Sequence, residues 1–413
     1  MKNEKLAAKT WKSKLKSPQL VSLALLTLIA VSLHLTRNNS VDPHVLIQNE
    51  DPIENPRVEN GPVKGCDLFS GTWVYDNLSY PLYKEGKCSF MEDDFACEKF
   101  GRKDLKYQNW RWKPHGCDIP RFNGTALLEK IRGKRLVYVG DSLNRNLWKS
   151  MLCLVDSYLP ATAKRSIILS GNMFYFRSIE YNASIEFYWS PLLVESNCDD
   201  IVKHRVWPRV VRIKSIEGHG RNWNDADILV FDSFMWWTGP RDITLLWGSF
   251  GSPEAIKKTV NKKLLPYEIA LRTWSNWVEM HVDRDKTKLF FVGPTAYREG
   301  STMWGAHHTC FNLNEPTFDE AYWRSLMSPE MDRIIESTLK ELENRGVRVQ
   351  YLNITQLSSY RGDAHPSTHR TFWGVASNEQ LKNMSKYADC VHWCLPGVPD
   401  VWNEILYDYI MKF

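Results

Sequence analysis

Two kinds of hydrophobic pattern divide the chain. Residues 19–35 form an apolar run without Lys, Arg, Asp or Glu, and six lysines precede it. A basic flank keeps an N-terminus in the cytoplasm, so the run predicts a signal anchor over 18–36 after a cytoplasmic tail over 1–17. The short run favours thin secretory membranes, and we expect a type II single-pass protein of the Golgi apparatus with a luminal domain. A cleaved signal peptide is the alternative, although no small-residue cleavage site follows the run.

Beyond a polar, proline-bearing stem over 37–63, short apolar runs alternate with amphipathic segments. The apolar runs predict strands over 134–139, 185–189, 210–213, 227–231, 289–292 and 347–352. The amphipathic segments predict helices over 143–156, 266–282 and 329–344. Strands that alternate with helices indicate an α/β fold, with a parallel sheet covered by helices on both faces. In such a sheet, ligands bind where the strands end at their carboxyl edge.

The segment 64–118 differs from the remainder, 119–413. It is rich in turns and cysteine and has few periodic runs, which predicts a loop-rich N-terminal cap stapled by disulfides onto a larger α/β domain. The chain has nine cysteines and no Cys-x-x-Cys pair, so we expect disulfides in an oxidising lumen and no metal site. Glycosylation acceptors of the form Asn-x-Ser/Thr occur at Asn38, Asn77, Asn123, Asn182, Asn353 and Asn383.

Charge and aromatic content narrow the class of partner. The first 17 residues carry six Lys and one Glu, which accounts for the whole formal charge of +5. The rest of the chain is near neutral, which argues against nucleic-acid binding, since that requires a basic face. The 18 tryptophans exceed ordinary usage and favour exposed aromatic platforms for carbohydrate rings, although core packing accounts for many of them.

Ser142 is the first residue with chemistry to offer. The predicted strand 134–139 ends in Gly140, Asp141 and Ser142, and the predicted helix follows at once. This arrangement places a hydroxyl at the positive end of a helix dipole, where free backbone N–H groups can hold an oxyanion. The alternative is that Ser142 only caps the helix. We expect the adjacent Asp141 to support the turn structurally.

A serine nucleophile needs a base, and the best candidate lies near the C-terminus. Asp389 precedes His392 by three residues, a spacing that lets the carboxylate orient the imidazole and stabilise its protonated form. An Asp–His pair at this spacing is weak evidence for a catalytic site when taken alone. The evidence becomes stronger when the pair is combined with the turn at Ser142. The other candidate histidines are more typical of surface or structural positions: His307, His308, His365 and His369.

A second set of polar and aromatic residues is expected near the same sheet edge. Asp232 and Ser233 follow the predicted strand 227–231, and two tryptophans come next. We assign six residues to substrate binding: Arg145, Asp232, Ser233, Trp236, Trp237 and Trp393. A salt bridge is the alternative for Arg145, and core packing is the alternative for at least one of the tryptophans after Ser233.

Several motifs resemble one plant family. They are Cys66-Asp67-Leu68-Phe69-Ser70-Gly71-Thr72-Trp73-Val74, Pro81-Leu82-Tyr83, Arg111-Trp112-Lys113-Pro114, Gly140-Asp141-Ser142-Leu143-Asn144-Arg145 and Asp389-Cys390-Val391-His392-Trp393-Cys394-Leu395-Pro396-Gly397. From residue 65 onward the chain resembles the trichome-birefringence-like family of wall polysaccharide O-acetyltransferases, which belongs with the SGNH/GDSL-type hydrolase folds. The resemblance implies an SGNH-like fold with Ser142 as nucleophile, His392 as base and Asp389 as the orienting acid.

The same resemblance implies the disulfide pattern, which cysteine spacing alone leaves open. The implied bridges are Cys66–Cys117, Cys88–Cys153, Cys97–Cys394 and Cys310–Cys390. Cys198 is then the odd cysteine, and two bridges flank His392.

One position departs from the SGNH pattern. These hydrolases present an Asn side chain to the oxyanion from a strand end in the middle of the domain, whereas this chain has Asp232 there. A carboxylate would repel an oxyanion. We therefore expect Ser233 or another donor to fill the role, or an oxyanion hole built from the Ser142 N–H and a loop amide such as that of Gly171.

These observations predict a double displacement. Ser142 takes an acetyl group from acetyl-CoA or a relayed acetyl carrier, and the acyl-enzyme passes it to a polysaccharide hydroxyl without a metal or a bound cofactor. The resemblance favours O-2 or O-3 of xylan, with mannan, xyloglucan and pectin as other acceptors, and a complex with a glycosyltransferase is a further expectation. An acetyl esterase with the same triad and a noncatalytic wall-polysaccharide binding protein are the alternatives.

Overall fold

The computed structural model describes residues 66–164, 166–239, 241–295, 310–319, 321, 328–371, 378–382 and 387–413. The chain divides into two compact units, Met1–Lys64 and Gly65–Phe413. The predicted tail, anchor and stem fall in the first unit and lie outside the described residues, as do Asn38, Asn383, His307 and His308. Within the ranges that the structure describes, no helix is long and apolar enough to cross a bilayer.

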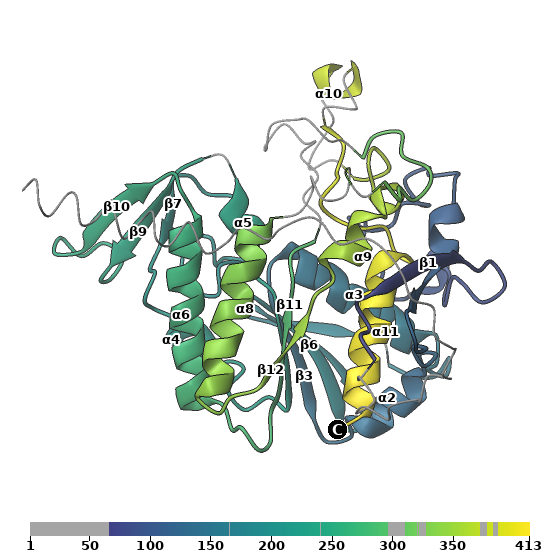
Figure 1. The fold of residues 1–413 in the computed structure, drawn as a ribbon, viewed down its shortest axis with the longest axis horizontal. Helices are drawn as coiled ribbons and strands as arrows, with labels where there is room; N and C mark the ends of the chain where they lie inside the picture. The colour runs from purple at the N-terminus through teal and green to yellow at the C-terminus, as the bar shows by residue number, and fades with distance from the viewer. Residues whose placement is uncertain are drawn as a thin grey trace, which may run out of the picture. The chain divides into compact units, whose positions relative to one another are not determined.

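The second unit is built on a seven-stranded sheet with the order β12-β11-β8-β3-β6-β5-β4 (Figure 1). The strands are β3 (Arg135–Gly140), β4 (Ile167–Ser170), β5 (Met173–Ser178), β6 (Ala183–Trp189), β8 (Ile228–Phe231), β11 (Lys288–Val292) and β12 (Val349–Leu352). The five strands from β12 to β6 are parallel, whereas β5 and β4 add an antiparallel edge. The predicted parallel sheet is therefore confirmed, and the sequence prediction lacked its antiparallel edge.

Helices cover both faces of this sheet, as predicted. The helices of the described ranges are α2 (Gly124–Lys130), α3 (Ser142–Asp156), α4 (Glu217–Gly220), α5 (Met235–Thr238), α6 (Leu264–His281), α8 (Pro329–Asn344), α9 (Thr355–Ser359), α10 (Asn378–Lys382) and α11 (Val398–Met411). Neighbouring residues of β11 point to opposite layers. Phe290 packs on Tyr409 of α11, whereas Phe291 packs on Trp274 of α6. Figure 1 shows α6 and α8 on one side of the sheet and α3 and α11 on the other.

The predicted strand at 210–213 belongs to a separate sheet. β7 (Arg209–Val211) pairs with β9 (Ile243–Trp247), which pairs with β10 (Ile256–Val260). In Figure 1 this small sheet lies beside α6, away from α3 and α11. The residues of β10 are mostly exposed, so its sequence lacks the apolar alternation of a half-buried strand.

The N-terminal cap is a loop-rich segment with one antiparallel pair, β1 (Gly71–Tyr75) and β2 (Trp110–Pro114). The described residues include the short 3-10 helices η1 (Glu85–Lys87), η2 (Lys106–Asn109) and, later in the chain, η3 (Gly362–Ala364). The structure confirms all four implied disulfides: Cys66–Cys117, Cys88–Cys153, Cys97–Cys394 and Cys310–Cys390. Two of them join the cap to the α/β domain. Cys198 is the free cysteine and is buried.

Four predicted glycosylation acceptors lie in the described ranges. Asn77, Asn123 and Asn182 are exposed, and Asn353 is partly buried. The Asn123 side-chain oxygen accepts the Ala126 N–H at 3.0 Å and caps α2, which leaves its amide nitrogen unused by that contact. Glycosylation at these four asparagines stays a prediction.

Candidate active site

The turn between β3 and α3 presents Ser142. A side chain at Gly140 would meet the Asp232 carbonyl oxygen at 2.4 Å, so this position has no room for a Cβ. The carboxylate of Asp141 accepts the Leu143 N–H at 2.8 Å and caps α3, of which Ser142 is the first residue. Asp141 therefore has the structural role predicted for it, and the Ser142 hydroxyl is not needed as the cap.

Ser142, His392 and Asp389 form a continuous hydrogen-bonded chain. His392 Nε2 lies 2.8 Å from Ser142 Oγ, and His392 Nδ1 lies 2.9 Å from Asp389 Oδ2. When Nδ1–H donates to the carboxylate, Nε2 is the acceptor for the serine hydroxyl. This is the geometry of a serine nucleophile with an oriented general base, and 250 residues of sequence separate its first two members.

Asp389 is held as a carboxylate by donors on several sides. Its Oδ1 accepts the backbone N–H groups of Val391 and His392 at 3.0 Å each, and its Oδ2 lies 3.0 Å from an Arg370 nitrogen. Burial opposes ionisation, but the charge and hydrogen bond of His392, with Arg370, hold the pKa of Asp389 well below its usual range. Burial also opposes protonation of His392, and Asp389 outweighs it, so the pKa of His392 is raised.

Covalent and polar contacts fix the loop that carries His392. Cys390 is bridged to Cys310 and Cys394 to Cys97, so a disulfide holds the chain on each side of His392, as expected. The His392 carbonyl oxygen lies 2.7 Å from Nδ1 of His365. His365 is buried, which agrees with the structural role predicted for it.

Several residues near the triad were not predicted. Asn146, one helical turn after Ser142, accepts the Trp393 N–H at 2.8 Å and joins α3 to the His392 loop. Phe95 of the cap lies 6.0 Å from the His392 ring centre, and the charges of Arg205 and Arg370 act on each other. Arg370 and Asn146 lie near the motifs, yet no spacing rule connects them to Asp389 or Trp393. The readable signals were those of the triad itself, the strand–turn–serine motif and the spacing between Asp389 and His392.

The prediction that Ser233 binds substrate or serves as the oxyanion donor is wrong. Its hydroxyl donates to the Pro191 carbonyl oxygen at 3.0 Å and accepts the Trp237 indole N–H at 3.1 Å. Both hydrogen bonds of Ser233 lie in the protein interior. Gly171 lies in the exposed turn between β4 and β5 with a φ of +58°. Its amide and the Ser142 N–H stay predictions as oxyanion donors.

The structure favours the salt-bridge alternative for Arg145. Its guanidinium lies 2.6 Å from the Glu92 carboxylate, which also pairs with Lys149 at 2.8 Å. Because Glu92 belongs to the cap and both cations belong to α3, this cluster joins the two parts of the domain. Arg145 is therefore engaged in a structural contact, and its contact with substrate stays a prediction.

The predicted tryptophans separate into buried and accessible rings. Trp237 is 1% exposed and Trp393 is 0% exposed, so neither offers a face to a sugar, and their assignment to substrate binding is wrong. Trp236 is only partly buried. It packs 5.6 Å from the Trp189 ring and 4.4 Å from the Arg209 guanidinium. Trp189 is the strand neighbour of Gly140, so Trp236 lies near the nucleophile turn.

Asp232 is also buried, at 2% exposed, and is not placed to meet a substrate from solvent. Burial first, and then the neighbouring Asp141, raise the pKa of Asp232 well above its usual range. The repulsion expected from a carboxylate at this position therefore does not arise when the group is protonated.

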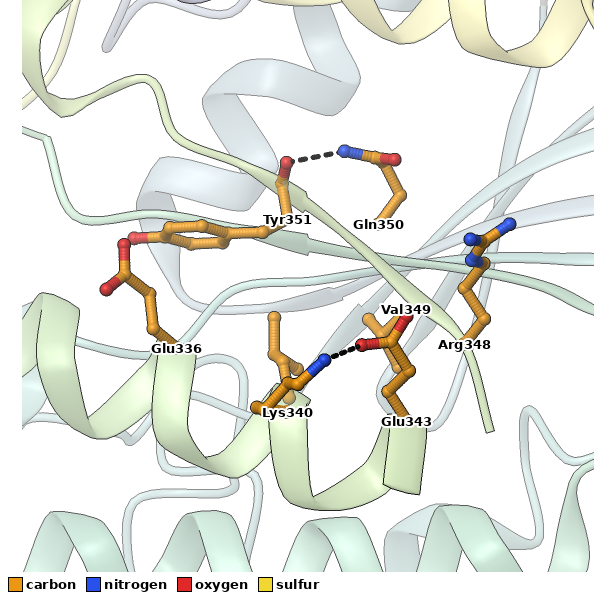
Figure 2. A pocket seen from close by; sticks show the side chains of 8 residues that line it. Glu336, Lys340, Glu343, Arg348, Val349, Gln350 and Tyr351 are labelled. Atoms are coloured by element: carbon orange, nitrogen blue, oxygen red, sulfur yellow. Dashed lines mark hydrogen bonds and ion pairs between the residues drawn. The ribbon is translucent and has the colours of Figure 1, made fainter. Parts of the chain in front are cut away.

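A separate hollow of about 500 Å³ lies between α8 and the edge strand β12 (Figure 2). Glu336, Lys340, Glu343, Arg348 and Tyr351 line it, and Lys340 pairs with Glu343 of the same helix at 2.8 Å. No triad residue is among its lining residues. Across the described ranges, no group of three or more His, Cys, Asp or Glu is arranged to hold a metal ion.

Comparison with known proteins places this geometry in a family. Residues 119–409 match the PC-Esterase model, described as a GDSL/SGNH-like acyl-esterase family found in Pmr5 and Cas1p. Residues 64–118 match the PMR5 N terminal domain.

Curated relatives cover most of the chain. Protein trichome birefringence-like 34 from Arabidopsis thaliana is 50% identical over 375 residues, 89% of this chain and 91% of that protein. Xylan O-acetyltransferase 14 from Oryza sativa subsp. japonica is 46% identical over 401 residues, with 88% and 84% covered. Xylan O-acetyltransferase 13 from the same rice is 47% identical over 351 residues, with 84% and 70% covered. The chain therefore belongs to the PC-Esterase family of GDSL/SGNH-like acyl-esterases, alongside the trichome birefringence-like proteins and xylan O-acetyltransferases.

Proposed function

We propose that this protein is a polysaccharide O-acetyltransferase that acetylates xylan through an acyl-enzyme on Ser142. The single observation that carries the proposal is the hydrogen-bonded chain from Ser142 through His392 to Asp389. The names of the relatives supply the substrate class, since several are xylan O-acetyltransferases.

The first half-reaction acetylates the enzyme. Ser142 Oγ attacks the carbonyl carbon of an acetyl donor while His392 Nε2 takes the hydroxyl proton. When the tetrahedral intermediate collapses, the donor group leaves with that proton, and Ser142 carries an acetyl ester. Asp389 keeps the imidazole oriented and stabilises its protonated form. The Ser142 N–H at the start of α3 is the donor that we assign to the developing oxyanion, where the helix dipole favours negative charge.

The second half-reaction repeats the proton path with a sugar. A polysaccharide hydroxyl gives its proton to His392 Nε2 and attacks the acetyl ester, and Ser142 leaves with the proton returned. For xylan the acceptor atoms are O-2 or O-3 of a xylosyl unit. The donor is acetyl-CoA or a relayed acetyl carrier, and the sugar hydroxyl replaces the proton that leaves with the donor group.

Accessible aromatic groups support an acceptor path beside the triad. Trp236 is partly buried near the nucleophile turn, and Arg209 stacks between Trp236 and Trp207, with distances of 4.4 and 4.7 Å. Trp207 is 38% exposed. Aromatic surfaces of this kind suit the apolar faces of sugar rings. We place the sugar units next to the reacting one along this path.

The topology belongs to the proposal as well. The apolar run 19–35 would anchor a type II protein in the Golgi membrane with the catalytic unit in the lumen, in reach of a glycosyltransferase partner. The disulfides support an oxidising compartment. Protease protection of a tagged C-terminus in sealed Golgi vesicles would test this topology, and digestion of the tag without detergent would contradict it.

An acetyl esterase is the second candidate, because the matching family model is described as an acyl-esterase. Water and a sugar hydroxyl attack the same ester, so the triad serves both reactions. The two functions separate in one assay. The purified protein is incubated with an acetyl donor and xylo-, manno- or xyloglucan oligosaccharides, and products are read by mass.

Acetyl units added to xylo-oligosaccharides by the wild type, and absent with Ser142→Ala, are the expected result. Loss of acetyl groups from acetylated oligosaccharides without any gain would instead identify an esterase. Gain on manno- or xyloglucan oligosaccharides alone would overturn the choice of xylan.

A further inference from the structure

Two buried carboxyl groups lie directly behind the nucleophile turn. Asp141 follows β3 and Asp232 follows β8, and these strands are parallel neighbours. The Asp232 N–H donates to the Val139 carbonyl oxygen at 3.0 Å, which brings the two strand ends together. Asp141 is 0% exposed and Asp232 is 2% exposed. A pair of carboxylates in such a place would be strongly destabilised unless something neutralised one of them.

The surrounding donors do not satisfy this pair. Asp141 Oδ1 accepts the Leu143 N–H, but within the described ranges no donor reaches Asp141 Oδ2 or either carboxyl oxygen of Asp232. The two carboxyl groups instead act on each other across the paired strand ends. Two carboxylates only accept hydrogen bonds, so a hydrogen bond between the two groups requires a proton on one of them.

The adjoining cavity leads to the same conclusion. Asp232 lines a cavity of about 10 Å³ together with Asn144 and Trp402, at the lower limit of the space that one water molecule needs. Asn144 Nδ2 donates to the Val139 and Val230 carbonyl oxygens at 2.9 Å. Asn144 Oδ1 accepts no hydrogen bond from the described residues. The unpartnered polar atoms around this cavity are therefore oxygens, which a protonated carboxyl group suits better than a second carboxylate.

The proton belongs on Asp232. Asp141 accepts a backbone N–H at the positive end of α3 and feels the charge of His392, both of which favour its ionised form. Asp232 has neither contact. Tyr267 of α6 also interacts with the pair, and burial raises the pKa of its phenol well above the usual range, so it stays neutral.

We propose that Asp232 is a positioning residue of the active site, which stays protonated and donates a hydrogen bond to Asp141. This bond orients the Asp141 carboxylate that caps α3, and so holds Ser142 in line with His392. An asparagine at this position would supply an N–H donor in the same place without titrating. The catalytic part of this inference rests on the proposed function, whereas the protonation of Asp232 does not.

The protonation is tested by stability. Because the pKa of Asp232 is raised in the folded protein, the free energy of unfolding falls as the pH rises from about 4 toward that pKa. The melting temperature of the full chain is measured from pH 5 to 9 for wild type and Asp232→Asn. The asparagine variant should melt higher than wild type at alkaline pH, with a smaller fall across the range. Parallel curves for the two proteins would overturn the proton on Asp232.

The positioning role is tested by acetyl transfer over the same pH range. Asp232→Asn should keep kcat near the wild-type value at neutral pH and extend activity to higher pH. Asp232→Ala removes the donor and should lower kcat roughly 10²-fold with little change in KM, the size of effect that a misplaced reacting group produces. Asp332→Asn, which removes another buried acid with a raised pKa away from the triad, should leave kcat unchanged.

A loss of kcat in Asp232→Asn as large as that in Asp232→Ala would overturn the donor role. An alkaline limit of activity unchanged in Asp232→Asn would overturn it too. If the wild type transfers no acetyl group, the proposed function fails while the melting curves still decide the protonation.

Discussion

At the scale of single residues, charge around His392 decides when it can act as a base. Asp389 raises the pKa of His392 against the effect of burial, and the positive charge of Arg370 lowers it. General-base catalysis needs the neutral imidazole, so the acidic limit of activity follows the pKa of His392. Arg370 therefore affects the pH range of activity through its charge, which lowers the pKa of His392.

Replacing Arg370 tests this tuning. In Arg370→Gln the cation that opposes protonation of His392 is lost, so its pKa rises and the acidic limb of the kcat/KM profile moves to higher pH. Lys99→Gln, which breaks an exposed pair with Asp93, is the matched control and should not move the limb. An acidic limb at the wild-type position in Arg370→Gln would contradict the electrostatic coupling.

Asp389→Asn tests the orienting acid. The amide cannot stabilise the protonated imidazole and favours the wrong tautomer, so we expect kcat to fall roughly 10³–10⁴-fold. Combined with Ser142→Ala, the loss should not add, because the two residues act as one unit. Single and double variants are compared by rates of acetyl transfer. A double variant whose loss equals the product of the two single losses would argue against a shared triad.

At the scale of elements, α11 meets the N-terminal cap through buried acids. Asp400 accepts the hydroxyl groups of Tyr83 at 2.9 Å and Ser150 at 2.6 Å, while Glu404 accepts that of Tyr80 at 2.9 Å. Burial raises the pKa of Asp400 to about 7 and that of Glu404 to about 8. The contact between cap and α11 is therefore most stable where both acids are protonated.

Glu404→Gln tests this contact. The raised pKa means that wild-type stability falls as the pH climbs from about 4 to about 8. The amide does not titrate, so the variant should be more stable than wild type at pH 8 by about 1–3 kcal/mol and similar near pH 5. Denaturant unfolding at both pH values measures this, with the exposed Glu129→Gln as control. Equal stability of variant and wild type at pH 8 would refute the buried-acid account.

The elements also show what the sequence could predict. Buried apolar runs such as those of β3, β8 and β11 are readable because both faces of a parallel strand are covered. β10 is mostly exposed and gives no such signal. The triad was predictable from a strand–turn–serine motif and an acid-to-base spacing. Which tryptophans lie in the core was not, because Trp236 and Trp237 are adjacent and differ only in their three-dimensional surroundings.

At the scale of the whole molecule, a disulfide joins the cap to the loop that carries His392. The Cys97–Cys394 bridge spans 297 residues and ends two positions after His392. Phe95, two residues before Cys97, lies against the His392 ring. By contrast, the Cys66–Cys117 bridge lies wholly within the cap and closes a shorter loop. Loss of the Cys97–Cys394 bridge should therefore affect both stability and catalysis. Loss of the Cys66–Cys117 bridge should affect chiefly stability.

Removal of each bridge separates these effects. The double variant Cys97→Ala/Cys394→Ala should lose about 2–5 kcal/mol of unfolding free energy and also lower kcat at temperatures where it remains folded. Cys66→Ala/Cys117→Ala should lose stability with kcat retained. Calorimetry and acetyl-transfer rates on the same preparations provide both readouts. Equal kcat in the two double variants would contradict the link between cap and His392.

The central claim is an acetyl ester on Ser142, and intact-protein mass tests it most directly. The protein is mixed with an acetyl donor without acceptor, quenched in acid and digested to locate the modification. The account predicts one added acetyl group on the peptide that contains Ser142, absent in Ser142→Ala, and its disappearance with acetylated product when xylo-oligosaccharide is added. Transfer to oligosaccharide that persists in Ser142→Ala would contradict the account.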